Sequence, residues 1–140
     1  MEIIEYEALH LKALEDIYFN ARRDAFFWMD TTGFRHSDFS KDTQGERIWV
    51  AIEGDTLLGF IAVWQADHFI HHLYVDKRAY RQGVGMALIN KVRQVYKKPL
   101  GLKCLCKNER AISFYQAQGF SVLERGKDSL GEYYFMSLPE

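Results

Sequence analysis

Long hydrophobic runs are absent from this chain of 140 residues. A membrane-spanning helix needs about 18 or more consecutive apolar residues, and no stretch of the sequence approaches that length. The first residues, Met1-Glu2-Ile3-Ile4-Glu5, also lack the basic region that starts a secretory signal peptide. We therefore expect a cytoplasmic protein that has no membrane as a partner.

The chain also carries little net charge and few cysteines. The formal net charge is −1, so there is no basic field that would attract nucleic acid. The two cysteines, Cys104 and Cys106, lie two residues apart in an expected strand, where their side chains share a face about 7 Å apart. That separation is too large for an easy disulfide, and a single C-x-C pair is weak support for a metal site. We expect core thiols in a reducing compartment, and no metal.

Apolar and aromatic residues are abundant. They make up 48% and 15% of the chain, which is typical of a globular protein and excludes a disordered one. A length of 140 residues allows one domain with a real core and is too short for two ordinary domains. Residues 1–140 are therefore expected to form a single domain.

The hydrophobic spacing predicts alternating strands and helices. Gly54-Asp55, between two runs rich in β-branched and aromatic residues, is typical of a hairpin. Expected strands cover residues 2–6, 47–53, 56–64, 69–75, 100–106, 120–124 and 132–138. Expected helices run from about 9 towards 26, from a cap at 37 through 43, from 84 to before the proline at 99, and over 109–118. Hairpins come first and a strand–helix–strand crossover follows, which predicts an α/β domain with a mixed sheet.

A glycine-bearing turn carries the strongest functional signal. The expected strand Phe69–Val75 leads through a polar turn to Gly83-Val84-Gly85, where a helix begins at once. Free first-turn N–H groups, the helix dipole and the small glycines together favour a bound phosphate. Taken alone the turn is weak, because it lacks the Lys-Ser/Thr end of a P-loop and the third glycine of a dinucleotide fingerprint.

A second motif follows 23 residues after Gly85. It reads Asn108-x-x-Ala111-x-x-Phe114-Tyr115-x-x-x-Gly119-Phe120. Together with Leu73-Tyr74-Val75-Asp76 and the glycine turn, it resembles the GCN5-related N-acetyltransferase (GNAT) superfamily. The resemblance implies the GNAT fold, with a mixed, mostly antiparallel sheet of about seven strands that splays at its centre and has helices on both faces. It also implies acetyl-CoA as the acyl donor.

The resemblance also implies where acetyl-CoA would bind. Backbone N–H groups of about Arg81 to Ala87 would hold the diphosphate, and main-chain groups beside the splay would pair with pantetheine. The implied cofactor contacts are Leu73, Tyr74, Val75, Arg81, Gln82, Gly83, Val84, Gly85, Met86 and Asn108. One position departs from the family pattern, because Tyr80 stands where Gln or Arg is usual, with Arg81 one step away.

The resemblance assigns Tyr115 as the general acid that protonates the leaving thiolate; the alternative is an aromatic core residue at helical spacing from Ala111. Residue His71 is the candidate general base, because an imidazole with a pKa near ~6.5 suits accepting a proton from an ammonium. The alternatives are His72 or water alone. Adjacent strand residues face opposite ways, so only one of the two histidines is expected to point into the cleft.

The acceptor site is expected near the first two helices. Phe27 and Trp28 could line an aromatic pocket there, and Asp24, Asp30 or Asp38 could hold an ammonium; the alternative is that the aromatic residues only pack the helix on the sheet.

The sequence thus favours an N-acetyltransferase acting on a small amine or on a peptide or protein amine, as a monomer or homodimer. Two alternatives remain, a non-catalytic acyl-CoA sensor that would need the groove but neither Tyr115 nor His71, and a nucleotide-binding domain.

Overall fold

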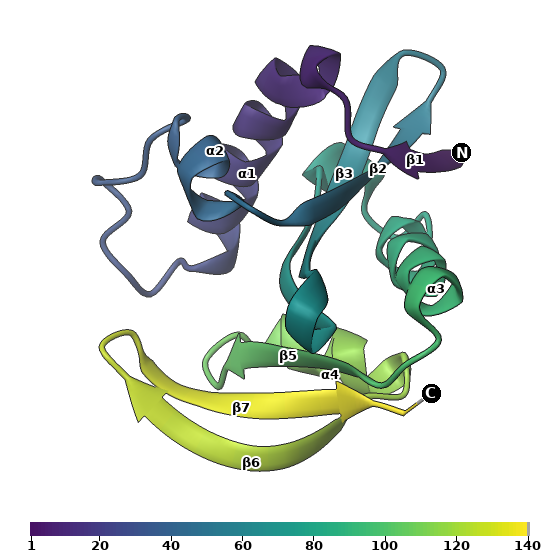
Figure 1. Ribbon diagram of the computed structural model, residues 1–140. Coiled ribbons are helices and arrows are strands. Elements are labelled where there is room, and N and C mark those ends of the chain that lie inside the picture. The colour runs from purple at the N-terminus through teal and green to yellow at the C-terminus, as the bar shows by residue number, and fades with distance from the viewer. Residues whose placement is uncertain (140) are drawn as a thin grey trace.

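A single mixed sheet organises residues 1–139, which the computed structural model describes. Its strand order is β1-β2-β3-β4-β5-β7-β6, and only the β4–β5 pair is parallel (Figure 1). The strands are β1 (Glu2–Glu5), β2 (Arg47–Glu53), β3 (Thr56–Trp64), β4 (Phe69–Val75), β5 (Leu100–Leu105), β6 (Ser121–Asp128) and β7 (Gly131–Leu138). The predicted element order and the mixed, mostly antiparallel sheet are confirmed.

Helices cover both faces of the sheet. They are α1 (Leu11–Ala25), α2 (Asp38–Asp42), α3 (Val84–Tyr96) and α4 (Glu109–Ala117), with short 3-10 turns η1 (Ala8–His10), η2 (Gln65–Asp67) and η3 (Lys77–Ala79). One core joins α1 and α2 to Val50, Phe60 and Ala62, while the other joins α3 and α4 to Ala51 and Ile61. Strands β2 and β3 are therefore buried on both sides, which explains their continuous apolar runs. None of the helices in residues 1–139 is both long and apolar enough to cross a membrane.

Several predicted boundaries shift, and the start of the first helix and the end of β6 shift most clearly. The first helix was expected from about Leu9, but Ala8–His10 form a 3-10 turn in which the Glu7 N–H donates to His10 Nδ1 at 3.0 Å, and α1 begins at Leu11. The expected end of the strand at 124 is wrong, because β6 continues to Asp128 and pairs with β7 as far as Gly131. Cross-strand ion pairs such as Arg125–Glu132, at 2.7 Å, stabilise this polar extension.

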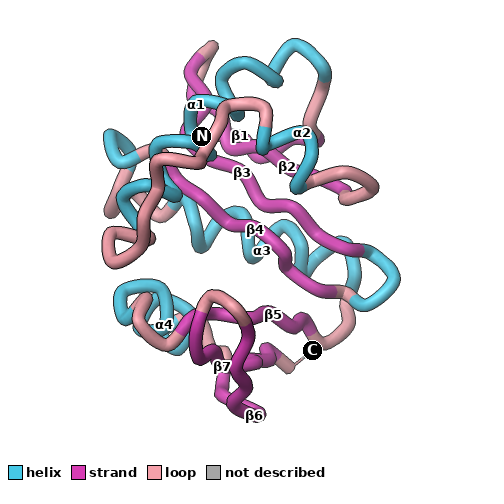
Figure 2. Tube along the Cα trace, turned by 90° about the vertical axis from the view of Figure 1, so that its left-hand side faces the viewer, coloured by secondary structure: helices cyan, strands magenta, loops and turns pink. Residues whose placement is uncertain are grey.

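The two central strands separate, as expected for the splay. Strands β4 and β5 pair only at Phe69–Gly101 and Ile70–Leu102, and the two traces then diverge (Figure 2). Strand β4 keeps its pairing with β3 as far as Val75, so within residues 1–139 its β5-facing backbone edge has no strand partner beyond Ile70. An extended ligand could therefore add along this edge, in the way that peptides add to exposed strands.

A β-bulge lies at the point of separation. Opposite Ala62 and Val63 of β3 stand His72 and Ile70, so that His71 is the extra residue. Because a bulge interrupts the alternation of side chains, Ile70 belongs to the α3-side core whereas His72 contacts Tyr18 on the α1 side. The expectation that the two histidines face opposite ways is wrong, since both side chains reach Glu46.

Candidate active site

The turn after β4 presents free backbone donors. Gly83 has a left-handed φ of 78°, and the non-glycine residue Arg81 has a φ of 65°. Helix α3 starts at Val84 without a side-chain cap, and within residues 1–139 no hydrogen bond occupies the N–H groups of Val84, Gly85 or Met86. These donors and the positive end of the helix dipole suit an anionic ligand.

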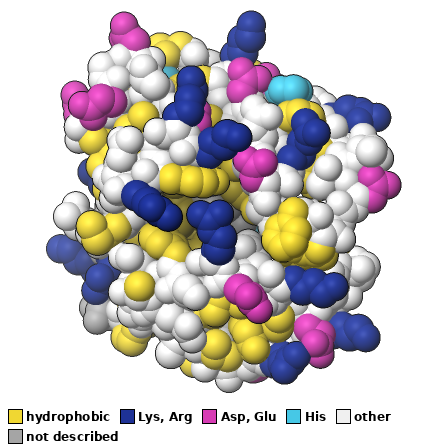
Figure 3. Space-filling model, turned by 180° about the vertical axis from the view of Figure 1, so that it is seen from behind, with side chains coloured by type: hydrophobic (Ala, Val, Ile, Leu, Met, Phe, Trp, Pro, Cys, Tyr) yellow, Lys and Arg dark blue, Asp and Glu magenta, His cyan; other side chains and the backbone are white. Residues whose placement is uncertain are grey.

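Basic and aromatic side chains border this turn. The carboxylate of Asp76 caps η3 and binds Arg78 at 2.7 Å, so this arginine is already paired. The ring of Tyr80 is 40% exposed and lies 5.7 Å from the Arg110 guanidinium of α4. Seen from behind, the surface shows an apolar hollow with Lys and Arg side chains at its rim (Figure 3). Arg81 is exposed, and Gln82 reaches back to the Arg78 carbonyl at 3.5 Å.

Along the splay, the side chains of β4 pack on one or the other face of the sheet, while its backbone edge faces the gap. The side chains of Leu73 and Val75 pack on the α3-side core. Tyr74 instead packs on the other face, with its ring 5.4 Å from Tyr18. Any contact of Tyr74 with a ligand along this edge would therefore come from its backbone.

Tyr115 lies on α4 and packs on the same core as Leu73 and Val75 of β4, where the two strands separate. Asn108 caps this helix, because its Oδ1 accepts from the Ala111 N–H at 3.4 Å, as predicted. The Tyr115 ring packs against Phe120 at 5.5 Å. Burial raises the pKa of Tyr115, with Cys104 as a further cause, so the phenol keeps its proton at neutral pH.

A carboxylate that the sequence analysis missed lies behind the two histidines. Glu46 Oε2 contacts His71 Nδ1, and Oε1 lies 3.8 Å from His72 Nε2. The Glu46 side chain is only 2% exposed, whereas that of His71 is 50% exposed. Burial raises the pKa of the Glu46 carboxyl. A lone glutamate between a glycine turn and a strand gives no recognisable signal, because the fold brings His71 to it across 25 residues and the bulge of β4 adds His72.

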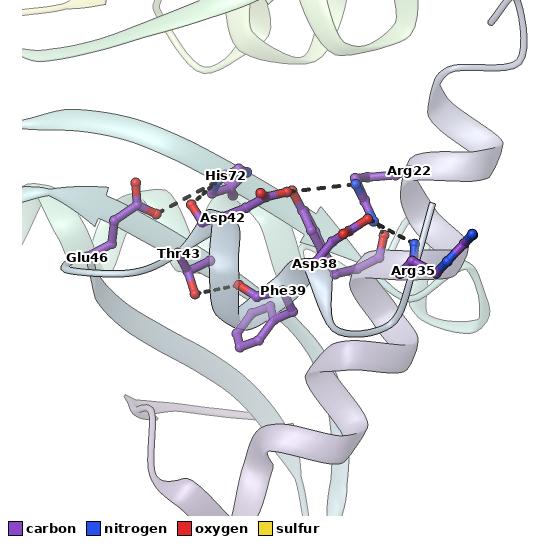
Figure 4. Close-up of polar contacts among 9 residues, drawn as sticks. Arg22, Arg35, Asp38, Phe39, Asp42, Thr43, Glu46 and His72 are labelled. Atoms are coloured by element: carbon purple, nitrogen blue, oxygen red, sulfur yellow. Dashed lines mark hydrogen bonds and ion pairs between the residues drawn. The ribbon is translucent and has the colours of Figure 1, made fainter. Parts of the chain in front are cut away.

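Polar contacts hold α2 against His72 and α1 (Figure 4). His72 Nε2 donates to the Asp42 carbonyl at 3.2 Å. Arg22 Nη2 contacts Asp38 at 3.1 Å, and its Nη1 lies 3.8 Å from Asp42. The Thr43 hydroxyl closes the end of α2 by donating to the Phe39 carbonyl at 2.7 Å. These contacts thus hold α2 against the bulged strand β4.

The predicted acceptor residues do not lie together beside these contacts of α2. Phe27 is 78% exposed and contacts Trp28 edge-on at 5.4 Å, so the alternative in which Phe27 packs the helix on the sheet is wrong. Asp38 is occupied by Arg22, which makes it a poor ammonium site. Asp30 accepts from the Thr32 N–H in its own turn at 3.0 Å.

Comparison with known proteins decides the family. The sequence model described as the acetyltransferase (GNAT) family matches residues 11–120 of the chain. The chain belongs to the GNAT family.

Relatives of this GNAT chain include the peptidyl-lysine N-acetyltransferase YiaC of Escherichia coli K12, which is 34% identical over 100 residues. That match covers 71% of this chain and 65% of YiaC, just under two thirds of its length.

Solved structures with the same fold include PaiA N-acetyltransferase from Thermoplasma acidophilum in complex with coenzyme A. Its TM-score is 0.83 at 16% identity, over 99% of this chain and 98% of that one. The ribosomal-protein-S18-alanine N-acetyltransferase of E. coli aligns with a TM-score of 0.73 at 18% identity, over 99% of this chain and 92% of that one.

The stability of this GNAT chain should depend on pH through His72. Burial lowers the pKa of His72 to about 4, below the ~6.5 of an unfolded histidine. Because the unfolded chain binds the proton more tightly, this contribution to stability is present above pH ~6.5 and is lost as the pH falls towards 4. The loss is on the order of 3 kcal/mol.

Urea denaturation of the wild type and of His72→Gln at several pH values measures this effect. The glutamine can keep a donor for the Asp42 carbonyl, so its curve should fall less steeply between pH 6.5 and 4. Equal slopes for the two proteins would show that His72 does not carry this dependence.

Gly85 separates α3 from α4 in this GNAT chain. A Cβ at Gly85 would lie 2.8 Å from Cζ of Phe114. Overpacking typically costs about 1–3 kcal/mol, which exceeds the gain in helix propensity of up to about 1 kcal/mol. We expect Gly85→Ala to lower the free energy of unfolding by about 1 kcal/mol in urea denaturation. Gly33→Ala, with nothing within 4 Å of its Cβ, is the control, and equal stability of the two variants would contradict this packing role.

Proposed function

We propose that this chain transfers the acetyl group of acetyl-CoA to a primary amine by direct attack in a ternary complex. The observation that carries the proposal is the separation of β4 from β5 after Ile70, with Tyr115 packed on the same core as Leu73 and Val75 of β4. Membership of the GNAT family supports it. The uncapped start of α3 supplies donors that fit a diphosphate, and the free edge of β4 fits an extended pantetheine.

Tyr115 and His71 take the two proton-transfer roles in this proposal. Tyr115 would donate a proton to the departing thiolate, since burial keeps its phenol protonated. His71 would accept a proton from the ammonium of the acceptor, since its imidazole is half exposed beside the splay. The backbone N–H near Leu73 would stabilise the oxyanion. Phe27 and Trp28 remain candidates for acceptor contacts.

The acceptor in this proposal is a primary alkyl amine, either free or on a peptide. YiaC, the relative described above, is named as a peptidyl-lysine N-acetyltransferase. A lysine side chain and a small alkyl amine present the same ammonium group, with a pKa near ~10.4. The base therefore has the same task for both kinds of acceptor.

Ligand binding followed by an activity assay tests the proposal. Isothermal titration with acetyl-CoA, CoA, ATP and NAD should show binding of the first two ligands alone. Release of free thiol from acetyl-CoA should then depend on an added amine or lysine peptide. Binding of CoA without turnover on any acceptor would indicate the non-catalytic sensor, and preference for ATP or NAD would indicate a nucleotide-binding domain.

A further inference from the structure

The α1–α2 face of the sheet has an open hollow next to His71. Its volume is about 400 Å³, and its lining residues are Trp64, Asp67, Phe69 and His71. Trp64 is paired with Phe69 across β3 and β4, and the Phe69 ring lies 5.8 Å from the ring of His71. Phe69 and His71 are two residues apart in β4 and share a face by ordinary strand alternation, and the bulge then brings His72 to the same side.

The hollow has the chemistry of a cation site. Trp64 is 43% exposed and lines the hollow, so part of its aromatic side chain is open to a ligand there. Asp67 is exposed and, within residues 1–139, forms no ion pair. Aromatic faces and a carboxylate both attract an ammonium group, and the neighbouring aliphatic chain would lie on the apolar ring surface.

Glu46 determines which nitrogen of His71 can act as a base. A carboxylate only accepts hydrogen bonds, so His71 Nδ1 carries the hydrogen that Glu46 Oε2 binds. In the neutral imidazole the lone pair then sits on Nε2. Glu46 is 2% exposed, and it therefore acts through His71 as a positioning residue.

We propose that the hollow formed by Trp64, Asp67 and Phe69 binds the primary alkylammonium of the acceptor and presents it to His71, which Glu46 positions. This inference rests on the proposed transfer activity and names the acceptor site within it. The acceptor reaches the splay from the α1–α2 face, while the start of α3 and Tyr115 lie towards the other face.

The proton and bond changes balance. The ammonium gives one proton to His71 Nε2, and the free amine forms an N–C bond to the acetyl carbon. The C–S bond breaks, and the thiolate takes the proton of Tyr115. The surplus proton on the new amide nitrogen restores the phenol, and His71 releases its proton to solvent through its exposed side. One proton is released for each acetyl group transferred.

A metal ion is the competing occupant of the histidine cluster. Ligand atoms of Glu46, His71 and His72 lie within 4.8 Å of one another. However, His72 Nε2 donates its hydrogen to the Asp42 carbonyl at 3.2 Å, so this nitrogen has no lone pair for an ion. Glu46 and His71 alone fall short of the three protein ligands typical of a catalytic zinc site.

Steady-state kinetics with wall variants test the site, using butylamine and a lysine peptide as separate acceptors. Asp67→Asn and Trp64→Ala should each raise the acceptor KM about tenfold and leave the acetyl-CoA KM unchanged. Asp55→Asn, an exposed aspartate in the β2–β3 turn, should change neither. An effect with only one of the two acceptors would identify the source of the ammonium.

Glu46→Gln tests the positioning role through the pH profile of kcat/KM. Loss of the carboxylate charge disfavours the imidazolium, so the acidic limb should move to lower pH and kcat should fall at least tenfold. The titratable and charged groups nearest His71 are Glu46, His72 and Asp67, and Asp42 and Arg22 lie behind them. The variant changes Glu46 alone. Glu46→Asp keeps the negative charge, so its acidic limb should lie between those of Glu46→Gln and the wild type.

Three results would overturn the inference. Unchanged acceptor KM values in both wall variants, with a raised value in Phe27→Ala, would place the acceptor at the first helix instead. A pH profile of Glu46→Gln that matches the wild type would remove its role. Stoichiometric Co²⁺ binding with a ligand-field absorption that Glu46→Gln abolishes would make the cluster a metal site. A wild-type protein that acetylates no amine would refute the proposed function itself.

Discussion

Tyr115→Phe should lower kcat by about 10²-fold or more while acetyl-CoA still binds. The variant removes only the phenolic oxygen, and the ring keeps its contact with Phe120 at 5.5 Å. Without a donor the thiolate must leave unprotonated or take a proton from water, and both routes raise the barrier. Thiol release at saturating acetyl-CoA and acceptor measures kcat, and titration with CoA measures binding.

Tyr96→Phe is the matched control for that experiment. Tyr96 lies in α3, and its hydroxyl donates to the Gln65 side chain of η2 at 3.1 Å, so its loss leaves α4 and Tyr115 unchanged. We expect its kcat to stay within about twofold of the wild type. Equal kcat values for Tyr115→Phe and the wild type, with intact CoA binding, would show that another group supplies the proton.

Arg22→Met should destabilise the chain by about 3 kcal/mol. The guanidinium is 8% exposed, contacts Asp38 at 3.1 Å and lies 3.9 Å from the centroid of the Tyr18 ring. Its Nε donates to the Tyr18 carbonyl at 3.3 Å. Methionine fills similar space, but it leaves Asp38 and Asp42 without their cation in a partly buried site. Urea denaturation at pH 7 measures the change in the free energy of unfolding.

Arg23→Met separates this effect from a general loss of positive charge. Arg23 is the next residue of α1, is exposed, and lies 5.2 Å from the Phe19 ring. Its loss should cost about 0.5 kcal/mol or less. Similar losses of stability in the two variants would mean that the buried ion pairs of Arg22 do not hold α2 in place.

Local signals in the sequence specified most of the fold. The Gly54-Asp55 turn and its flanking β-rich runs predicted β2 and β3 to the residue, because turn chemistry and strand propensity agree there. The Asn108 cap and the following apolar spacing predicted α4 within one residue. The end of β6 was missed because residues 125–128 are polar, and their strand conformation depends on pairing with β7.

The candidate site could be predicted only in part. Tyr115 and the glycine turn stand out because they belong to motifs with fixed spacing. Glu46 does not, since its contact with His71 spans 25 residues and its approach to His72 depends on a one-residue bulge in β4. A bulge has no reliable sequence signature here, and without it the alternation of a strand predicts a single inward histidine.

A crystal structure of the complex with acetyl-CoA tests the central claim most directly. We predict that the diphosphate accepts from the N–H groups at the start of α3, that pantetheine lies along β4 at Leu73 and Val75, and that the sulfur is within hydrogen-bonding distance of Tyr115 Oη. Acetyl-CoA bound outside the β4–β5 splay, or a Tyr115 hydroxyl remote from the sulfur, would contradict this account.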